Sequence, residues 1–242
     1  EVVSIEDQAN RYPAVEAVEV RTYAAARGES PIPLFRDVFD LEPDMVVLRD
    51  PGDGPTVDAL CRHLEARKTC LALSTTRTGD CAESLMRVLF LRVERVRFAR
   101  QVTAVLSQRL IRKLCNRCKE PFTPPVELVE RLGLAPRRRT TFYRPPKPSE
   151  SVCPECGGLG YRGRTGIFEL LLVDDTLRQV LAYQPSLESL RQAAWATRAW
   201  SMEREGALLV DAGVTSLQEL ARVLRLPSAG SPGAPAPSHV SA

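Results

Sequence analysis

The stretch EPDMVVLRDPGD, at residues 42–53, indicates the class of fold. Its central residues, 45–48, are all apolar, so a strand formed there would be hydrophobic on both faces. Strands of that kind belong to parallel sheets whose two faces are both covered. We therefore predict a buried parallel strand that is followed at once by charged residues.

Strand-like and helical segments alternate around this stretch through residues 1–114. The predicted strands lie at residues 2–5, 19–23, 45–48 and 71–75, and the predicted helices at residues 56–67 and 81–93. Such alternation is typical of an α/β fold with a mostly parallel sheet. Apolar residues at helical spacing predict a further helix at residues 98–114.

The composition excludes several classes of protein. Hydrophobic residues make up 44% and charged residues 26% of the 242 residues, which is ordinary for a globular protein. No apolar run approaches the roughly 18–20 residues that span a bilayer, so no membrane-spanning helix is expected. No secretory leader opens the sequence, and its first residues form a strand-like run, so we expect it to begin inside a domain.

Four of the seven cysteines form two pairs, Cys115-x-x-Cys118 and Cys153-x-x-Cys156. A Cys-x-x-Cys turn directs two thiolates at one point, and two such turns complete a tetrahedral sulfur shell for Zn²⁺. Four protein ligands leave no open coordination position, so the ion would be structural. Free thiols or redox pairs are the alternative interpretation. The long spacer at residues 119–152 is expected to form a hairpin of its own.

The second half of the chain is predicted to be mainly helical. After a strand or hairpin at residues 163–173, helices are expected at residues 176–183, 187–196, 202–210 and 217–226. The sequence thus predicts an α/β core at residues 1–114, a tetracysteine lobe at 115–173, a helical region at 174–226 and a disordered tail at 227–242.

Three stretches carry a resemblance to a known family. They are QRLIRKLCNRCK at residues 108–119, CPECGGLGYRGRTGIFE at residues 153–169, and the glycine-containing segment from Gly206 to Val223. Together they resemble the type II secretion and type IV pilus assembly ATPases. The resemblance implies a RecA-like ATPase core and membership of a homo- or hetero-hexamer of secretion ATPase subunits. It further implies a cytoplasmic location at the inner membrane and platform proteins of the secretion or pilus machine as partners.

The resemblance also implies where nucleotide-binding residues would lie. Glu6 and Asp7 match the first two acids of the family's acidic box, whose later glutamate is Asn10 in this chain. Arg36 matches the first of two arginines implied to contact phosphates, but Asp40 stands at the place of the second.

Three further positions depart from the family pattern. Asp50 stands where the resemblance places the water-polarising Walker B glutamate, and it is the candidate catalytic residue; its side chain is one methylene shorter. Arg49 replaces the glycine before it, and Arg77 replaces the sensor histidine. A placement error of about 1 Å can cost about 10²-fold in rate, so these departures predict weak or absent ATP hydrolysis.

The phosphate-binding loop, G-x-x-x-x-G-K-[ST], is missing from residues 1–242, which contain no Gly-Lys dipeptide. ATP and Mg²⁺ could therefore bind only if a longer protein supplied that loop. An alternative function is a nonhydrolysing scaffold or regulatory paralogue of the motor. A third is a zinc-ribbon module that binds nucleic acid, which the net charge of +3 disfavours; we expect no specific nucleic acid among the partners.

Overall fold

The computed structural model describes residues 1–134, 141–147 and 152–225, and the chain divides into two compact units. Unit 1 comprises Glu1–Leu106 and Leu170–Ala199, and unit 2 comprises Ser107–Glu169 and Trp200–Ala242. The units interleave along the chain, whereas the predicted regions follow one another in sequence order. The predicted tail at residues 227–242 lies outside the described residues.

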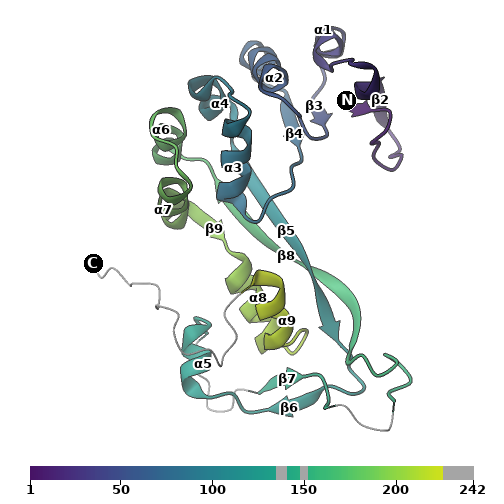
Figure 1. The fold of residues 1–242 in the computed structure, drawn as a ribbon, viewed down its shortest axis with the longest axis vertical. Coiled ribbons are helices and arrows are strands. Elements are labelled where there is room, and N and C mark those ends of the chain that lie inside the picture. The colour runs from purple at the N-terminus through teal and green to yellow at the C-terminus, as the bar shows by residue number, and fades with distance from the viewer. Residues whose placement is uncertain (135–140, 148–151, 226–242) are drawn as a thin grey trace. The chain divides into compact units, whose positions relative to one another are not determined.

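Unit 1 contains a parallel four-stranded sheet in the order β2-β1-β3-β4 (Figure 1). Its strands are β1 (Val2–Asp7), β2 (Val18–Tyr23), β3 (Met45–Leu48) and β4 (Leu71–Ser74). In register, Ile5 pairs with Leu48, and Leu48 pairs with Ser74. The four predicted strands and their parallel arrangement are confirmed, and the carboxyl ends of β1, β3 and β4 meet at one edge of the sheet.

One face of this sheet is covered by helices α1 (Ile32–Asp40) and α2 (Gly54–Ala66). The connections from β2 to β3 and from β3 to β4 move in the same direction across the sheet. Because such connections are right-handed, both helices lie on the same face. Buried side chains of strands and helices form one cluster there: Val3, Ile5, Phe35, Val38, Phe39, Val46, Leu48, Ala59 and Leu60. Asp53 accepts a hydrogen bond from the Thr56 N–H at 2.7 Å and caps α2.

The opposite face, which we call the open face, has a much smaller cover. The connection from β1 to β2 moves the other way, so the same handedness places residues 8–17 over it. That connection contains no helix. Leu71 and Leu73 on β4 are 50% and 51% exposed, whereas Glu6 on β1 is 3% exposed. The connection therefore buries the carboxyl end of β1 but leaves the apolar side chains of β4 accessible.

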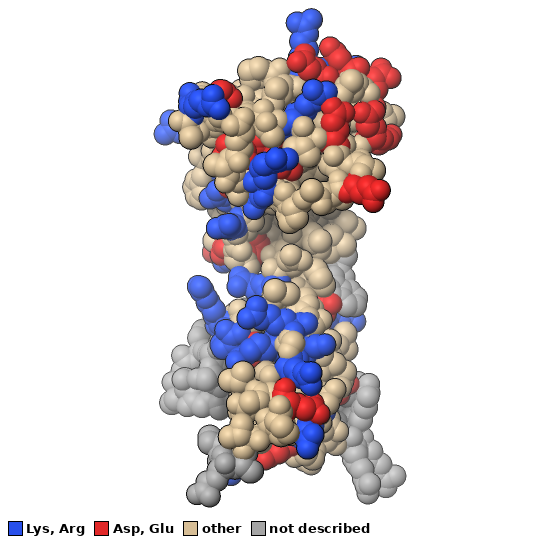
Figure 2. Space-filling view, turned by 90° about the vertical axis from the view of Figure 1, so that its right-hand side faces the viewer, with Lys and Arg blue, Asp and Glu red and all other residues tan. Residues whose placement is uncertain are grey.

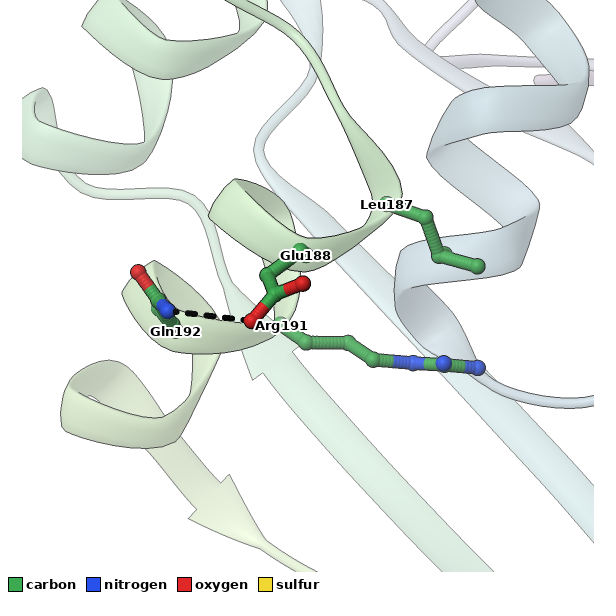
Figure 3. A pocket seen from close by; sticks show the side chains of 4 residues that line it. All are labelled: Leu187, Glu188, Arg191 and Gln192. Carbon is green, nitrogen blue, oxygen red and sulfur yellow. Dashed lines mark hydrogen bonds between the residues drawn. The ribbon is translucent and has the colours of Figure 1, made fainter.

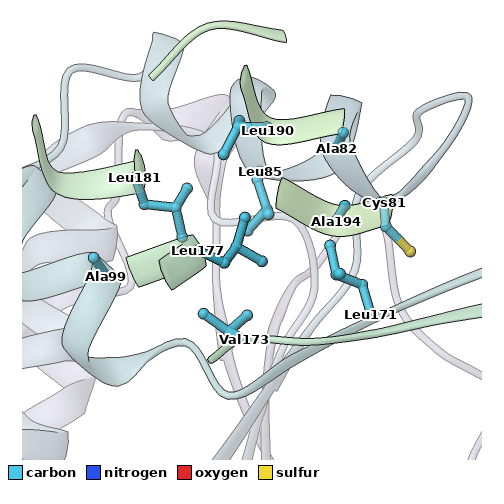
Figure 4. Close-up of a cluster of buried hydrophobic side chains, with 10 residues drawn as sticks. All are labelled: Cys81, Ala82, Leu85, Ala99, Leu171, Val173, Leu177, Leu181, Leu190 and Ala194. Atoms are coloured by element: carbon cyan, nitrogen blue, oxygen red, sulfur yellow. The ribbon is translucent and has the colours of Figure 1, made fainter. Parts of the chain in front are cut away.

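The remaining helices of unit 1 pack around a second cluster of buried side chains (Figure 4). These helices are α3 (Cys81–Phe90), α4 (Arg95–Gln101), α6 (Asp175–Tyr183) and α7 (Leu187–Thr197). A short 3-10 turn, η1 (Ala25–Arg27), follows β2. Asp80 and Asp174 cap α3 and α6 by accepting main-chain N–H bonds. The predicted helices at residues 81–93, 176–183 and 187–196 are confirmed, although α3 ends at Phe90.

A matched pair of leucines tests this cluster. Leu171 is fully buried and Leu172 is 49% exposed, although they are neighbours in one strand. Leu171→Ala should lower the free energy of unfolding by about 2–5 kcal/mol, because it leaves a cavity in a packed core. Leu172→Ala should lower it by about 0.5 kcal/mol or less. Urea denaturation of both variants checks the difference, and equal losses would contradict the packing in Figure 4.

The prediction of a helix at residues 98–114 is wrong. The chain forms α4, leaves the helical conformation at Val102, and continues as strand β5 (Ala104–Leu114). β5 belongs to a three-stranded sheet in the order β5-β8-β9, with β8 (Tyr161–Leu172) and β9 (Arg198–Trp200). Pairing with β8, which is remote in sequence, overrides the local apolar spacing. Leu106 and Leu110 of the supposed helical face are both exposed.

Unit 2 confirms that the spacer between the cysteine pairs forms a hairpin. Strands β6 (Glu120–Phe122) and β7 (Phe142–Arg144) pair antiparallel, with α5 (Val126–Arg131) in the connection. Helices α8 (Met202–Asp211) and α9 (Leu217–Leu224) complete the unit around Ile111, Phe142, Ile167, Met202 and Leu220. Gly206 lets these two helices approach closely, because a Cβ there would collide with Leu220.

Candidate functional site

The two cysteine pairs lie together in unit 2, after β5 and before β8. The four Sγ atoms are all within 4.8 Å of one another, and the Cys115–Cys153 and Cys118–Cys156 pairs are 4.0 and 3.6 Å apart. Four sulfurs bound tetrahedrally at about 2.3 Å from Zn²⁺ would be roughly 3.8 Å apart. The cluster could therefore hold a metal ion. Cys115 and Cys156 are buried, and the other two are half-buried.

Glycines shape the turn that carries the second pair. Gly157, Gly158 and Gly160 all have positive φ values, as close wrapping of the backbone behind the cysteines requires. The Gly160 N–H donates to Cys156 Sγ at 3.3 Å, and the Cys115 N–H donates to the Gly160 carbonyl at 3.0 Å. A Cβ at Gly160 would lie 2.6 Å from Pro145. These backbone contacts thus hold the two cysteine pairs next to each other.

The surroundings favour ionisation of one thiol and oppose it at another. A hydrogen bond from the Cys156 main chain lowers the pKa of Cys153 to about 7. Burial raises the pKa of Cys118 above its usual range. Thiolates, not thiols, bind metal ions, and a bound cation would supply the charge that keeps several of them ionised together.

Unit 2 also contains a charge network around a buried carboxylate, which the sequence did not predict. Glu219, at 1% exposure, accepts hydrogen bonds from Arg112 at 2.9 and 2.6 Å and from Arg222 at 2.8 and 2.7 Å. Burial opposes its ionisation, but these bonds outweigh that effect and lower the pKa of Glu219 to about 2. The Tyr161 ring stacks on the Arg112 guanidinium, and the Tyr161 hydroxyl lies 2.7 Å from Ser216 Oγ. The network joins β5, β8 and α9.

The acids predicted for nucleotide handling lie at the carboxyl edge of the unit 1 sheet. Glu6 accepts hydrogen bonds from Ser4 Oγ at 2.7 Å and from the Tyr12 N–H at 3.2 Å, and its carboxylate is 3.5 Å from Arg11 Nε. Asp7 accepts a hydrogen bond from the Ala25 N–H at 3.2 Å. Both carboxylates are therefore bound by groups of the chain itself.

Asp50 lies at the same edge, just past β3. Its φ is +20°, and its carboxylate accepts a bond from the Gly52 N–H at 3.3 Å and forms a 3.2 Å ion pair with Arg87 of α3. Among the described residues only the four cysteines form a group that could hold a metal ion, so Glu6, Asp7 and Asp50 do not converge as metal ligands. Arg36 lies exposed on α1, four residues before Asp40.

Two shallow hollows lie on unit 1. One, of about 580 Å³, is lined by Leu187, Glu188, Arg191 and Gln192 of α7 (Figure 3). The other, of about 540 Å³, is lined by Arg77, Thr78, Glu83, Met86, Arg87, Phe90, Leu91 and Leu187. Arg77 thus lines a hollow beside Arg87, the partner of Asp50. None of the predicted acids lines either hollow.

Comparison with known proteins identifies the family. The model of the family described as "Type II/IV secretion system protein" matches residues 1–222. This chain belongs to that family. The Type II secretion system protein E of Dickeya dadantii is 34% identical over 192 residues, which are 79% of this chain and 36% of that protein. The Type IV pilus assembly ATPase PilB of Thermus thermophilus is 31% identical over 191 residues, 76% of this chain and 20% of that one. The chain thus spans about a third of the length of the type II relatives it matches.

Solved structures support the same fold. The crystal structure of the pilus retraction motor PilT with bound ADP matches with a TM-score of 0.56 and 15% identity, over 92% of this chain and 52% of that one. The Legionella pneumophila ATPase DotB matches with a TM-score of 0.54 and 13% identity, over 93% and 51%. The expected RecA-like α/β fold is confirmed. Within the described part of the chain, no helix is long and apolar enough to cross a membrane.

Proposed function

We propose that this chain is the C-terminal portion of a secretion or pilus assembly motor subunit in which ATP hydrolysis is weak or absent. The observation that carries the proposal is the state of the acids at the carboxyl edge of the sheet. Arg11 lies beside Glu6, and Arg87 pairs with Asp50. Arginine keeps its charge near neutral pH, so each carboxylate already has a positive partner within the chain and does not need a metal ion to supply one.

Asp50 is also poorly placed for the role that the family resemblance gives it. A general base needs a free carboxylate within about 2.6–3.2 Å of the water that it activates. Asp50 Oδ1 accepts a hydrogen bond from the Gly52 N–H, and Asp50 Oδ2 accepts one from Arg87, so both carboxylate oxygens are engaged. Together with Asn10, Asp40 and Arg77, these contacts support a site that has lost efficient hydrolysis.

The tetracysteine cluster is proposed to hold a structural Zn²⁺ ion. Sulfur-only ligands in a tetrahedral arrangement favour Zn²⁺ over oxygen-preferring cations such as Mg²⁺ and Ca²⁺. Cys115, Cys118, Cys153 and Cys156 would be its ligands. The ion would pin the hairpin of β6 and β7 to the ends of β5 and β8.

Assembly and location follow from the family alone. We propose that the subunit joins a hexameric ring of its own kind or of related subunits, in the cytoplasm at the inner membrane, against platform proteins of the secretion or pilus machine. ATP and Mg²⁺ would bind only with a phosphate-binding loop from outside residues 1–242.

Contacts in unit 2 give the nucleic-acid alternative little support. Lys and Arg side chains do lie on the face of this unit that Figure 2 turns to the viewer. In the sequence of unit 2, Lys113, Arg162 and Arg164 are exposed. Binding of single strands also needs aromatic rings on which bases can stack. Tyr161 is already covered by Arg112, at 4.2 Å from the ring centroid.

The decisive measurement is ATP turnover by the whole gene product that contains this chain. We expect it to be at least about 10²-fold slower than that of Thermus thermophilus PilB assayed in parallel, because the candidate catalytic carboxylate of Asp50 is shorter than glutamate and already engaged by Gly52 and Arg87. Asp50→Glu should not restore turnover, since Arg87 would still bind the longer side chain. Turnover comparable to PilB, in the wild type or in Asp50→Glu, would contradict the proposal. Titration with a fluorescent ATP analogue separates a slow motor from a scaffold that binds no nucleotide.

A further inference from the structure

The segment after β1 is attached to the ends of neighbouring strands. Residues 8–12 leave β1 and turn over the open face of the sheet. The Tyr12 N–H donates to Glu6 on β1 at 3.2 Å, and the Tyr12 hydroxyl lies 2.9 Å from Thr75 Oγ1, just past β4. One residue of the connection therefore contacts both β1 and the residue that follows β4 at the edge of the sheet.

Arg49 makes the second attachment, from the end of β3. Leu48 is buried on the helix-covered face, so strand alternation directs the next residue, Arg49, to the open face. Its Nη1 donates to the carbonyl oxygens of Asn10 and Arg11 at 3.2 and 2.6 Å. Its guanidinium also lies over the Tyr12 ring, 4.4 Å from the centroid.

We propose that Arg49 and Tyr12 hold residues 8–12 as a strap across the carboxyl ends of β1, β3 and β4, with Arg49 as the positioning residue. A guanidinium can donate in a fixed plane to two carbonyl oxygens while its face stacks on an aromatic ring. Glutamine lacks the charge, and lysine lacks the planar fork. Because the strap carries the amide that binds Glu6, Arg49 also sets the surroundings of that carboxylate.

The strap has a consequence for ligands at this edge. Any group that used the carbonyl oxygens of Asn10 and Arg11, or the face of Tyr12, would have to displace the Arg49 side chain. If that ligand is a nucleotide, its identity rests on the proposed function. The strap itself is a property of the folded chain and can be tested without ATP.

Hydrogen exchange read by mass spectrometry tests the strap on the full 242-residue chain. In Arg49→Gln, the Tyr12 amide should exchange at least about tenfold faster, because bonds from a charged donor are lost. Arg49→Lys keeps the charge and should restore part of the protection. Arg36→Gln, which changes an exposed arginine on α1, is the control and should leave exchange at residues 8–12 unchanged.

Tyr12→Phe provides a second variant that disturbs the fold less. It removes the hydroxyl contact with Thr75 but keeps the ring under Arg49, so it should accelerate exchange less than Arg49→Gln does. Equal protection in the wild type and Arg49→Gln would overturn the strap, and so would equal acceleration in Arg36→Gln. An active ATPase with a protected segment would instead contradict the proposed function and leave the strap intact.

Discussion

Replacing Cys115 or Cys153 by serine is expected to release the proposed Zn²⁺ ion and to destabilise unit 2. A serine oxygen is a poor substitute for thiolate in a four-sulfur site, and the remaining three ligands lose the closed tetrahedron. Metal binding contributes directly to folding in small cysteine-held lobes. Here the two cysteine pairs anchor the ends of β5 and β8, so the hairpin between them would lose its attachment.

The expected size of this effect is large but below that of an isolated zinc finger. Zinc-finger peptides derive roughly 10–16 kcal/mol from their ion. Unit 2 also has its own core, which includes Ile111, Phe142 and Ile167, and part of the fold should persist. We expect the melting temperature of either variant to fall by about 10 °C or more. Elemental analysis of the purified chain should show zinc in the wild type and its loss in both variants.

Cys70→Ser is the matched control, because Cys70 is a half-buried thiol outside the cluster. It should keep the zinc and melt close to the wild type. Alkylation under denaturing conditions tests the redox alternative, since a disulfide would block two thiols in the untreated protein. Wild-type protein purified without metal, or full zinc content in Cys115→Ser, would contradict the metal site.

Local sequence patterns predicted the sheet of unit 1 because its strands are marked by their own residues. Residues 45–48 are apolar on both faces, and a parallel strand with covered faces is what such a run forms. The cysteine pairs were equally predictable, since Cys-x-x-Cys spacing fixes local geometry and glycines follow. In both cases the information lies within a few residues.

The failures concern pairings between remote segments. The apolar positions from Val102 to Leu114 fit helical spacing, yet β5 forms there because β8 provides a partner. The charge network around Glu219 was not predicted for the same reason, because its partners are remote in the sequence. Ser216 and Glu219 have the spacing of a capping box, and Ser216 Oγ accepts a hydrogen bond from the Glu219 N–H at 3.1 Å. The Glu219 carboxylate instead binds Arg112, which is 107 residues away in the sequence.

The acids at the sheet edge show a third limit. Glu6, Asp7 and Asp50 come after the strands predicted at residues 2–5 and 45–48, but the sequence alone did not show that Arg11 and Arg87 lie against Glu6 and Asp50. Arg49 was noted only as a departure from the family pattern. Its two carbonyl contacts depend on the path of residues 8–12, which is set by the handedness of the β1–β2 connection.

Removing the arginines around Glu219 is expected to cost more than removing Glu219 itself. The carboxylate is fully buried, whereas the Arg112 and Arg222 side chains are 41% and 59% exposed. Without Glu219, both guanidinium groups can return to water. Without the arginines, a charge stays buried and unpaired, which typically costs about 3–5 kcal/mol. The double variant Arg112→Met/Arg222→Met should lose that much, and Glu219→Gln about 1–2 kcal/mol, because glutamine can still accept the Arg112 N–H bond.

Acid titration gives this prediction its sharpest form. The pKa of Glu219 is held at about 2, below its ordinary value of 4.5, so its contribution to stability is present in full above pH 4.5. That contribution should vanish as the pH falls from 4.5 towards 2. The difference in unfolding free energy between wild type and Glu219→Gln isolates it, because loss of metal by protonation of the cysteines affects both proteins alike. Urea denaturation between pH 7 and pH 2.5 should show the difference shrinking towards zero. A difference that stays constant over this range, or a double arginine variant as stable as Glu219→Gln, would show that Glu219 is not held as a buried anion.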